Sequence, residues 1–225
     1  MERFDDIFRR GVGALRGHGF DPYPERVTVR VQNAREQLAA GLRYYLGDRA
    51  KWLPCYDEVA QWLTDNQGRG LLCTGLCGLG KTLVCQNILP VIIQQNMRLI
   101  VTTYTAQEMN DNIATVKRRH LVVIDDIGTE PAVKLDYGER KAPFFELCDE
   151  AEKRGHLLIL TTNLRTTHAI GKDGMPIPSI EDRYGDRVLS RLRGLVKVVE
   201  FKGKDMRQQS VAAASEHKQS LTTNK

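Results

Sequence analysis

The chain has 225 residues, 41% of them hydrophobic and 27% charged, which is enough for one globular domain with a sizeable core and a small extension. Lysine and arginine outnumber the acids by 33 to 28, giving a net charge of +5, which favours an anionic partner such as nucleic acid. An ordinary basic surface explains the same excess. The acidic amino terminus argues against a signal peptide, no apolar run suits a membrane helix, and the cysteines lack zinc-ligand spacing, so we expect a cytoplasmic protein with reduced core thiols.

Residues 1–50 predict a small helical extension. One helical face carries Phe4, Ile7 and Phe8, and a second, on a segment that Gly47 would close, carries Leu38, Leu42, Tyr45 and Leu46. A loop with Pro22 and Pro24 separates the two helices. We expect this extension to dock a partner. Simple packing on the main domain is the alternative.

Five short apolar runs follow, at 70–74, 98–103, 120–125, 156–162 and 195–201. The first four are nearly continuous in Leu, Ile and Val, which is typical of strands buried on both faces of a parallel sheet. Helices are predicted between them at 82–95, 105–118 and 142–154, the last ended by Gly155. The alternation predicts an α/β three-layer sandwich with a five-stranded parallel sheet over residues 51–207. Residues 208–225 are polar and are predicted to form a flexible tail.

Directly after the first predicted strand, Gly75–Thr82 reads GLCGLGKT and matches the phosphate-loop pattern G-x-x-x-x-G-K-[ST]. Glycines allow backbone N–H groups to converge on a triphosphate, and the following helix N-terminus adds its dipole. Lys81 is predicted to contact the β- and γ-phosphates and Thr82 to bind magnesium. The predicted ATP-binding residues of this segment are Gly75, Leu76, Cys77, Gly78, Leu79, Gly80, Lys81, Thr82 and Leu83. The alternative is a glycine-rich turn without a ligand.

Polar residues end two further strands at the edge where the phosphates are expected. Asp125 is predicted to hold magnesium, through water, and Asp126 to act as the general base that positions the attacking water. Taken alone, two such acids are helix caps or a solvated turn. Asn163, which follows HLLILTT, is predicted to hold the same water or the γ-phosphate, and a turn-forming role is its alternative.

Residues 182–193 carry four arginines on a predicted helix. One of them could stabilise charge on a phosphoryl group during transfer, and a solvated basic face is the alternative.

Together these motifs resemble those of the AAA+ ATPases of the DnaC/IstB branch, bacterial helicase loaders and transposition helper ATPases. GLCGLGKT resembles the family's Walker A, LVVIDDIG its Walker B, and LLILTTN its sensor 1 strand with Asn163 as the sensor. YGDRVLSRL resembles box VII, which implies that Arg191 is the arginine finger, and KGKDMR resembles sensor 2, which implies Arg207 at the ATP site. The resemblance covers about residues 52–207.

This resemblance implies an ATP-hydrolysing DNA-replication accessory factor that acts like a helicase loader, with a transposition helper ATPase as the alternative. It also implies a homo-oligomer with ATP and Mg²⁺ between subunits, a replicative helicase or transposase as partner, and single-stranded DNA. Two other classes stay open, a small-molecule P-loop kinase and a non-catalytic module whose affinity is switched by ATP. The tandem Asp125-Asp126 suits water activation better than transfer to a bound acceptor.

A basic run, Lys117-Arg118-Arg119, is the candidate DNA face, because clustered positive charge near a pore would track phosphates. A helix end whose cations complement the dipole is the alternative. Tyr104 is the nearby aromatic candidate for base stacking.

Overall fold

A five-stranded parallel sheet organises the molecule. The structure is a computed structural model that describes residues 3–19, 24–136 and 138–203. The strand order is β2-β3-β6-β1-β9, and every neighbouring pair is parallel. The strands are β1 (Gly70–Thr74), β2 (Thr102–Thr105), β3 (Leu121–Ile127), β6 (Leu157–Thr162) and β9 (Val196–Glu200). Each lies at a predicted run, although β2 begins later than predicted. The order places β1, which leads into the phosphate loop, next to β6 and β9.

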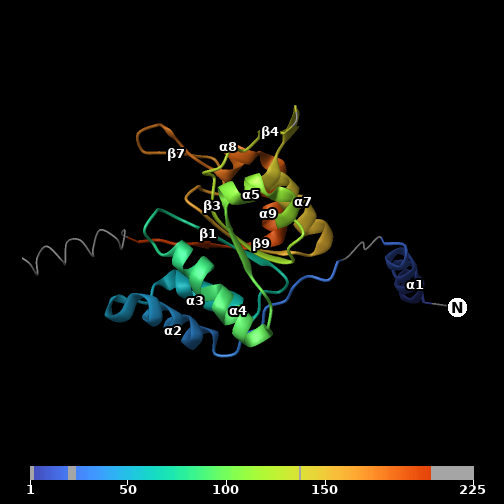
Figure 1. The fold of residues 1–225 in the computed structure, drawn as a ribbon, viewed down its shortest axis with the longest axis horizontal. Coiled ribbons are helices and arrows are strands. Elements are labelled where there is room, and N and C mark those ends of the chain that lie inside the picture. Colours follow the sequence, from blue (N-terminus) through green and yellow to red (C-terminus); the bar gives the residue numbers. More distant parts are fainter. Residues whose placement is uncertain (1–2, 20–23, 137, 204–225) are drawn as a thin grey trace, which may run out of the picture.

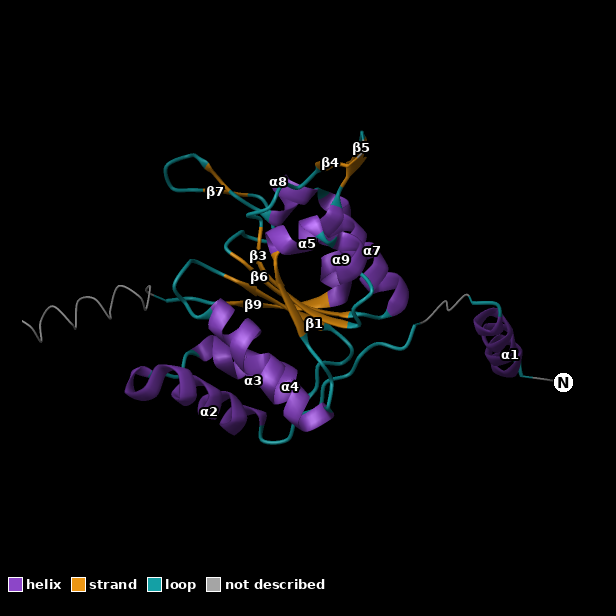
Figure 2. Ribbon diagram, in the orientation of Figure 1, coloured by secondary structure: helices purple, strands orange, loops and turns teal. Residues whose placement is uncertain are grey.

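Helices cover both faces of the sheet, which confirms the α/β three-layer P-loop fold. Figure 2 shows α2 (Ala34–Leu46), α3 (Pro54–Thr64) and α4 (Leu89–Met97) on one side and α5 (Ala106–Asp111), α7 (Pro143–Arg154) and α9 (Asp186–Leu195) on the other. Successive strand residues point to opposite faces, so Leu71 and Cys73 belong to the first core and Leu72 to the second. This two-sided burial explains the nearly continuous apolar runs of β1, β3 and β6. The prediction of two-sided burial is wrong for β2, which lies at the edge of the sheet and alternates half-buried and exposed residues.

The helix after the phosphate loop differs from a regular α-helix in its first turns. Residues Leu83–Ile88 are wound as a π-helix, and α4 continues from Leu89 with Pro90 in its first turn. A proline inside a helix lacks an N–H and displaces the carbonyl one turn earlier, so a locally wider winding accommodates it. The prediction of a helix here is confirmed, and the wider winding was not predicted.

The predicted helix at 105–118 is two short helices. Thr105 caps α5 in a reciprocal capping box with Glu108, and α5 ends at Asp111. Asn112, with φ −121°, interrupts the chain before α6 (Ile113–Val116). Its side-chain amide donates to the Glu108 carbonyl, which is a local hydrogen bond that competes with the helix ladder.

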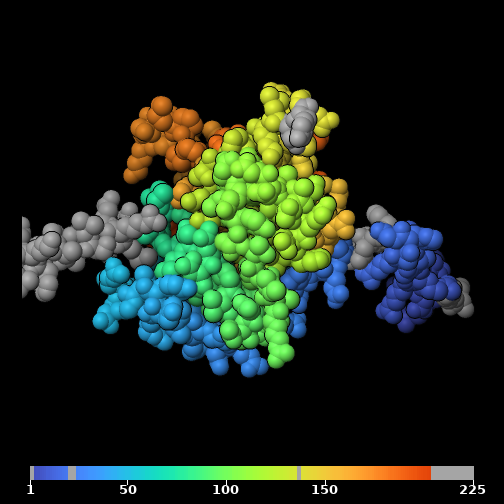
Figure 3. All heavy atoms as spheres, viewed as in Figure 1, coloured from blue at the N-terminus to red at the C-terminus, as the bar shows by residue number. Residues whose placement is uncertain are grey.

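The two helices of residues 1–50 behave differently. Figures 1 and 3 show α1 (Phe4–Gly17) apart from the main body, and none of its residues is buried. By contrast, Leu38 and Leu42 of α2 are buried in the same core as the strands, and α2 ends at Gly47 as expected. The core therefore begins before residue 50, while the docking role of the extension stays a prediction.

The remaining elements are short and lie outside the five-stranded sheet. They are a 3₁₀ turn (Gly47–Arg49), β4 (Lys134–Asp136), β5 (Glu139–Lys141), β7 (Ala169–Ile170), β8 (Pro176–Ile177) and α8 (Ile180–Tyr184). Gly155, with φ 70°, ends α7 as predicted. No helix in the described ranges is both long and apolar enough to cross a membrane. The predicted tail at 208–225 and Pro22 lie outside the described residues.

Candidate functional site

The phosphate loop connects β1 to the following helix, and its backbone requires glycine. Gly75, Gly78 and Gly80 have φ values of 129°, 79° and 84°. A Cβ on Gly75 would lie 2.2 Å from the Phe201 carbonyl oxygen, so a larger residue there would displace β9. Cys77 is exposed in this loop, which corrects the expectation that every cysteine is a core thiol, whereas Cys55, Cys73, Cys85 and Cys148 are buried.

Lys81 is the charged centre of the site. Its side chain is 5% exposed, and its ammonium donates hydrogen bonds to the carbonyl oxygens of Gly75 (2.7 Å) and Leu76 (2.8 Å). A third hydrogen bond, of 2.9 Å, runs to the Asn163 side-chain oxygen. Burial lowers the pKa of Lys81, and nearby Cys77, Asp126 and Asp125 partly oppose that shift. The structure thus brings the predicted sensor Asn163 into direct contact with the predicted phosphate-binding lysine.

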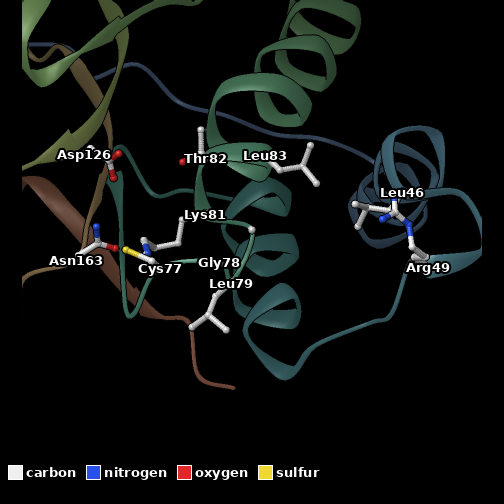
Figure 4. A pocket seen from close by; sticks show the side chains of 11 residues that line it. Leu46, Arg49, Cys77, Gly78, Leu79, Lys81, Thr82, Leu83, Asp126 and Asn163 are labelled. Carbon is white, nitrogen blue, oxygen red and sulfur yellow. Dashed lines mark hydrogen bonds between the residues drawn. The ribbon is translucent and has the colours of Figure 1, made fainter. Parts of the chain in front are cut away.

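A pocket of about 290 Å³ opens beside this lysine. Its lining from the predicted set is Cys77, Gly78, Leu79, Gly80, Lys81, Thr82, Leu83, Asp126 and Asn163, while Gly75 and Leu76 line the adjoining cavity. Figure 4 shows Asp126 and Asn163 on one side of Lys81, and Leu46 and Arg49 on the far side. Sequence reasoning missed Leu46 and Arg49, because nothing local indicates that the end of α2 turns toward the phosphate loop.

Asp125 lies at the carboxyl end of β3 and is 6% exposed. The Thr161 hydroxyl donates a 2.5 Å hydrogen bond to its carboxylate. Burial raises the pKa of Asp125, and hydrogen bonds from the Thr161 and Thr82 hydroxyls partly lower it again. Asp125 and Thr82, predicted from separate motifs, are therefore neighbours. Thr161 was missed as a site residue, although a hydroxyl at the end of an otherwise apolar strand was the available signal.

Asp126 adopts a left-handed backbone conformation with φ 56°. The register of β3 with β6 shifts between Ile124 and Ile127, so a bulge redirects Asp126 away from the ladder. Its backbone N–H donates a 2.9 Å hydrogen bond to the Thr161 hydroxyl. Its backbone carbonyl accepts a 2.9 Å hydrogen bond from the Thr129 hydroxyl. These bonds hold a strained residue at the pocket wall, a situation that is common at functional sites.

The donor chemistry of this cluster fits a hydrated Mg²⁺ ion. Thr82 and Asp125 offer a hydroxyl and a carboxylate, which are the hard oxygen ligands that Mg²⁺ prefers. The Asp125 carboxylate is buried and its pKa is raised, so a divalent cation would compensate a charge that the fold leaves poorly solvated.

Arg191, the predicted arginine finger, lies away from this pocket. It projects from α9 toward α7 and forms ion pairs with Asp149 (2.8 Å) and Glu152 (3.1 Å). Its guanidinium also lies over the Phe145 ring at 4.8 Å. Arg191 therefore does not reach the pocket beside Lys81 in its own chain. Arg207, the other predicted arginine of the site, lies outside the described residues.

The basic run at 117–119 divides into two environments. Lys117 pairs with Glu146 at 3.4 Å on the α7 side. Arg118 and Arg119 are exposed and directly precede His120 and β3, so they lie at the amino edge of the parallel sheet, opposite the phosphate loop. Tyr104 packs partly buried against the second core.

No protein-family model matches the chain, and no curated protein matches it. Among solved structures, the DnaC helicase loader is 16% identical, with 80% of this chain and 93% of that chain covered and a TM-score of 0.46. DnaI is 18% identical, with 61% of this chain and 72% of that chain covered and a TM-score of 0.42. DnaA from Aquifex aeolicus with bound AMPPCP is 18% identical, with 72% of this chain and 50% of that chain covered and a TM-score of 0.45.

All three solved structures are less than 25% identical to this chain and have TM-scores below 0.5, so no family, activity or partner of this chain follows from them.

Proposed function

We propose that this chain is an ATP-hydrolysing AAA+ protein that serves as a DNA-replication accessory factor, in the manner of a helicase loader. The observation that carries the ATPase is that Lys81, Asp126 and Asn163 line one pocket at the carboxyl ends of β1, β3 and β6. Asp125 lies behind this lining and is hydrogen-bonded to Thr82, which does line the pocket. This is the edge of a parallel sheet where ligands bind. A transposition helper ATPase is the runner-up, because it would use the same site.

In the proposed mechanism, the loop N–H groups and Lys81 bind the triphosphate. Lys81 exchanges the Gly75 and Leu76 carbonyls for phosphate oxygens, since two of its hydrogen bonds are directed to the loop and the third reaches Asn163 at the same pocket. Asp126 accepts a proton from, or orients, the attacking water, and the Asn163 amide keeps that water in line. A magnesium ion held by Thr82 and Asp125 would supply charge neutralisation at the phosphates.

A chain of this type would work in an oligomer. Because Arg191 does not reach its own pocket, it can serve hydrolysis only at the ATP of a neighbouring copy. We propose that ATP between subunits orders a homo-oligomer. Its partners in this proposal are a replicative helicase or a transposase together with single-stranded DNA, and its hydrolysis cycle releases them.

The test separates ground-state binding from chemistry. We expect Lys81→Ala to abolish ATP binding in calorimetry, because the lysine contacts phosphates before any bond breaks. We expect Asp126→Asn to keep its ATP affinity and to slow phosphate release by about 10²- to 10⁴-fold, the usual contribution of a general base. Asparagine also tolerates the left-handed backbone of Asp126, so this variant keeps the local fold.

Phosphate release is measured without any added acceptor, which distinguishes an ATPase from a small-molecule kinase. Equal loss of ATP affinity in both variants would contradict the assigned roles. Hydrolysis at the wild-type rate in Asp126→Asn would remove Asp126 from the mechanism.

A further inference from the structure

A second pocket, lined by apolar and basic side chains, lies at the edge of the sheet opposite the phosphate loop. It has a volume of about 420 Å³ and lies between the end of α4 and the segment that leads into β3. Its charged lining consists of Arg98, Arg118 and Arg119, with His120 beside them. We call these four residues the arginine pocket. The strands are parallel, so this pocket at their amino ends is separated from the ATP site at their carboxyl ends.

The positive charge of the arginine pocket is not neutralised within the described part of the chain. Among described residues, the side chains of Arg98, Arg118 and Arg119 have no hydrogen bond or ion pair, and no carboxylate lines the pocket. Glu150, an acid on this side of the molecule, is paired with Arg154. Three guanidinium groups therefore face one cavity without a counter-charge.

Arg98 occupies a backbone position that disfavours arginine. It follows α4 with φ 57° and ψ 26°, the left-handed conformation that glycine usually supplies after a helix. A side chain there is strained, and observed strain of this kind is a starting point for a functional hypothesis. A structural role is the alternative, since a cation also complements the negative end of the α4 dipole.

His120 is supported from behind by a second histidine. The ring centroids of His120 and His156 are 4.8 Å apart at an interplanar angle of 73°. His156 is 6% exposed, and both of its ring nitrogens lack a hydrogen-bond partner. Burial lowers the pKa of His156, and His120 adds to that shift. His120 itself is exposed at the pocket and offers an N–H donor in either neutral tautomer.

We propose that the arginine pocket binds phosphate groups of a nucleic-acid backbone. A guanidinium presents a planar fork of N–H donors that matches a phosphate, and three of them around a cavity exceed what a single exposed cation provides. Among the residues that the structure describes, no Phe, Tyr or Trp lines the pocket, so the proposed contact is to the backbone and not to stacked bases. This inference deepens the proposed function by giving its DNA a binding site remote from ATP.

The experiment compares matched variants of the full chain. Fluorescence anisotropy is measured with a labelled single-stranded oligonucleotide and with a duplex between about 50 and 200 mM salt. The Arg118→Ala/Arg119→Ala double variant should show weaker binding and a log–log salt slope shallower by about two. The control, Lys117→Ala/Lys172→Ala, removes the same charge outside the pocket and should retain the wild-type slope.

Arg98→Gly is the sharper variant, because glycine suits the left-handed backbone and the fold should be retained. It should weaken nucleic-acid binding although Arg98 is remote in sequence from the basic run. ATP hydrolysis without DNA is followed in parallel, and the three variants should hydrolyse ATP at the wild-type rate. If wild-type protein hydrolyses no ATP, the proposed ATPase is refuted, and the result says nothing about the pocket.

Three results would overturn the proposal. The first is that wild-type protein binds neither oligonucleotide at low salt, with or without ATP. The second is that the control double variant loses as much affinity as the pocket variant. The third is that calorimetry with inorganic phosphate shows binding that the arginine variants lose while no oligonucleotide binds, which would make free phosphate the ligand.

Discussion

Asp125 carries a buried carboxylate, and burying its charge lowers the stability of the folded protein. Burial is the largest cause of its raised pKa, and the Thr161 and Thr82 hydroxyls offset that cause only in part. The native pKa lies above the ordinary value of 3.8, so the folded state holds the proton more tightly than the unfolded chain. The resulting destabilisation is absent below the unfolded pKa, grows as pH rises through the native pKa, and is fully present at neutral pH.

We therefore expect Asp125→Asn to raise the melting temperature of the nucleotide-free protein at pH 7. Asparagine keeps an acceptor for the Thr161 hydroxyl and removes the buried charge. A gain of about 1 kcal/mol, the common size of single-site effects, corresponds to about 2–4 °C in a chain of this length. The gain should shrink as pH falls toward 4, and Mg²⁺ with ATP should stabilise the variant less than wild type.

Calorimetric scans across pH measure this effect, with exposed Asp111→Asn as the control. A lower melting temperature for Asp125→Asn at pH 7 would show that the hydrogen bonds to the carboxylate outweigh the cost of burying its charge. That result would contradict the raised pKa of Asp125.

At the scale of elements, Glu130 joins the loop after β3 to α8. Its side chain is 1% exposed and accepts hydrogen bonds from the Gly128 N–H, at 2.9 Å, and from the Tyr184 hydroxyl. Arg183 donates to its backbone carbonyl. Burial raises the pKa of Tyr184, and Glu130 adds to the shift, so the hydroxyl stays a donor. The loop after β3 and the end of α8 are thereby held together.

Glu130→Ala should lower the free energy of unfolding by about 2–4 kcal/mol, because it removes a buried side chain and leaves a half-buried N–H and a half-buried hydroxyl without acceptors. Urea denaturation measures the change. Glu139→Ala, at an exposed site in β5, should stay within about 0.5 kcal/mol of wild type. A Glu130→Ala variant as stable as the control would mean that water satisfies both donors.

The contrast between these elements explains what the sequence could predict. Strands β1, β3 and β6 and the phosphate loop were predictable, because a strand buried on both faces is a continuous apolar run and the phosphate loop is a contiguous glycine motif. The break at Asn112 and the π-helical turn before Pro90 were not predictable from the spacing of apolar residues. Each arises from one residue whose side chain competes with or removes a backbone hydrogen bond of the helix, and the apolar spacing does not register a single residue. The roles of Arg49 and Glu130 depend on contacts between distant segments, and no local pattern encodes them.

At the scale of the whole molecule, the two proposed anion sites occupy opposite edges of one sheet. The ATP pocket lies where β1, β3 and β6 end, and the arginine pocket lies where β2 and β3 begin. β3, which runs from the arginine pocket to the ATP pocket, is buried along almost its whole length, so it is a rigid connection between them. Such a separation allows DNA and ATP to bind without competing for the same charges.

Arg191 determines whether one chain forms a complete ATPase. In the single chain its guanidinium is held by Asp149 and Glu152 and stacks on Phe145, and Arg191, after Lys153, helps to hold the pKa of Asp149 below its usual value. As a finger, it would exchange these carboxylates for the γ-phosphate of a neighbour. A monomer would then bind ATP normally and hydrolyse it poorly, and activity per subunit should rise with protein concentration.

The decisive experiment mixes two inactive variants. Arg191→Ala should lower turnover by about 10³- to 10⁵-fold at nearly unchanged ATP affinity, as for arginine fingers generally. Lys81→Ala retains the finger and lacks the phosphate site, so mixed oligomers contain some complete composite sites and should recover phosphate release. Arg187→Ala, one turn earlier on α9 and exposed, is the matched control and should hydrolyse like wild type. If Arg187→Ala loses activity while Arg191→Ala keeps it, the finger is Arg187, and the carboxylates of α7 hold Arg191 for structure alone.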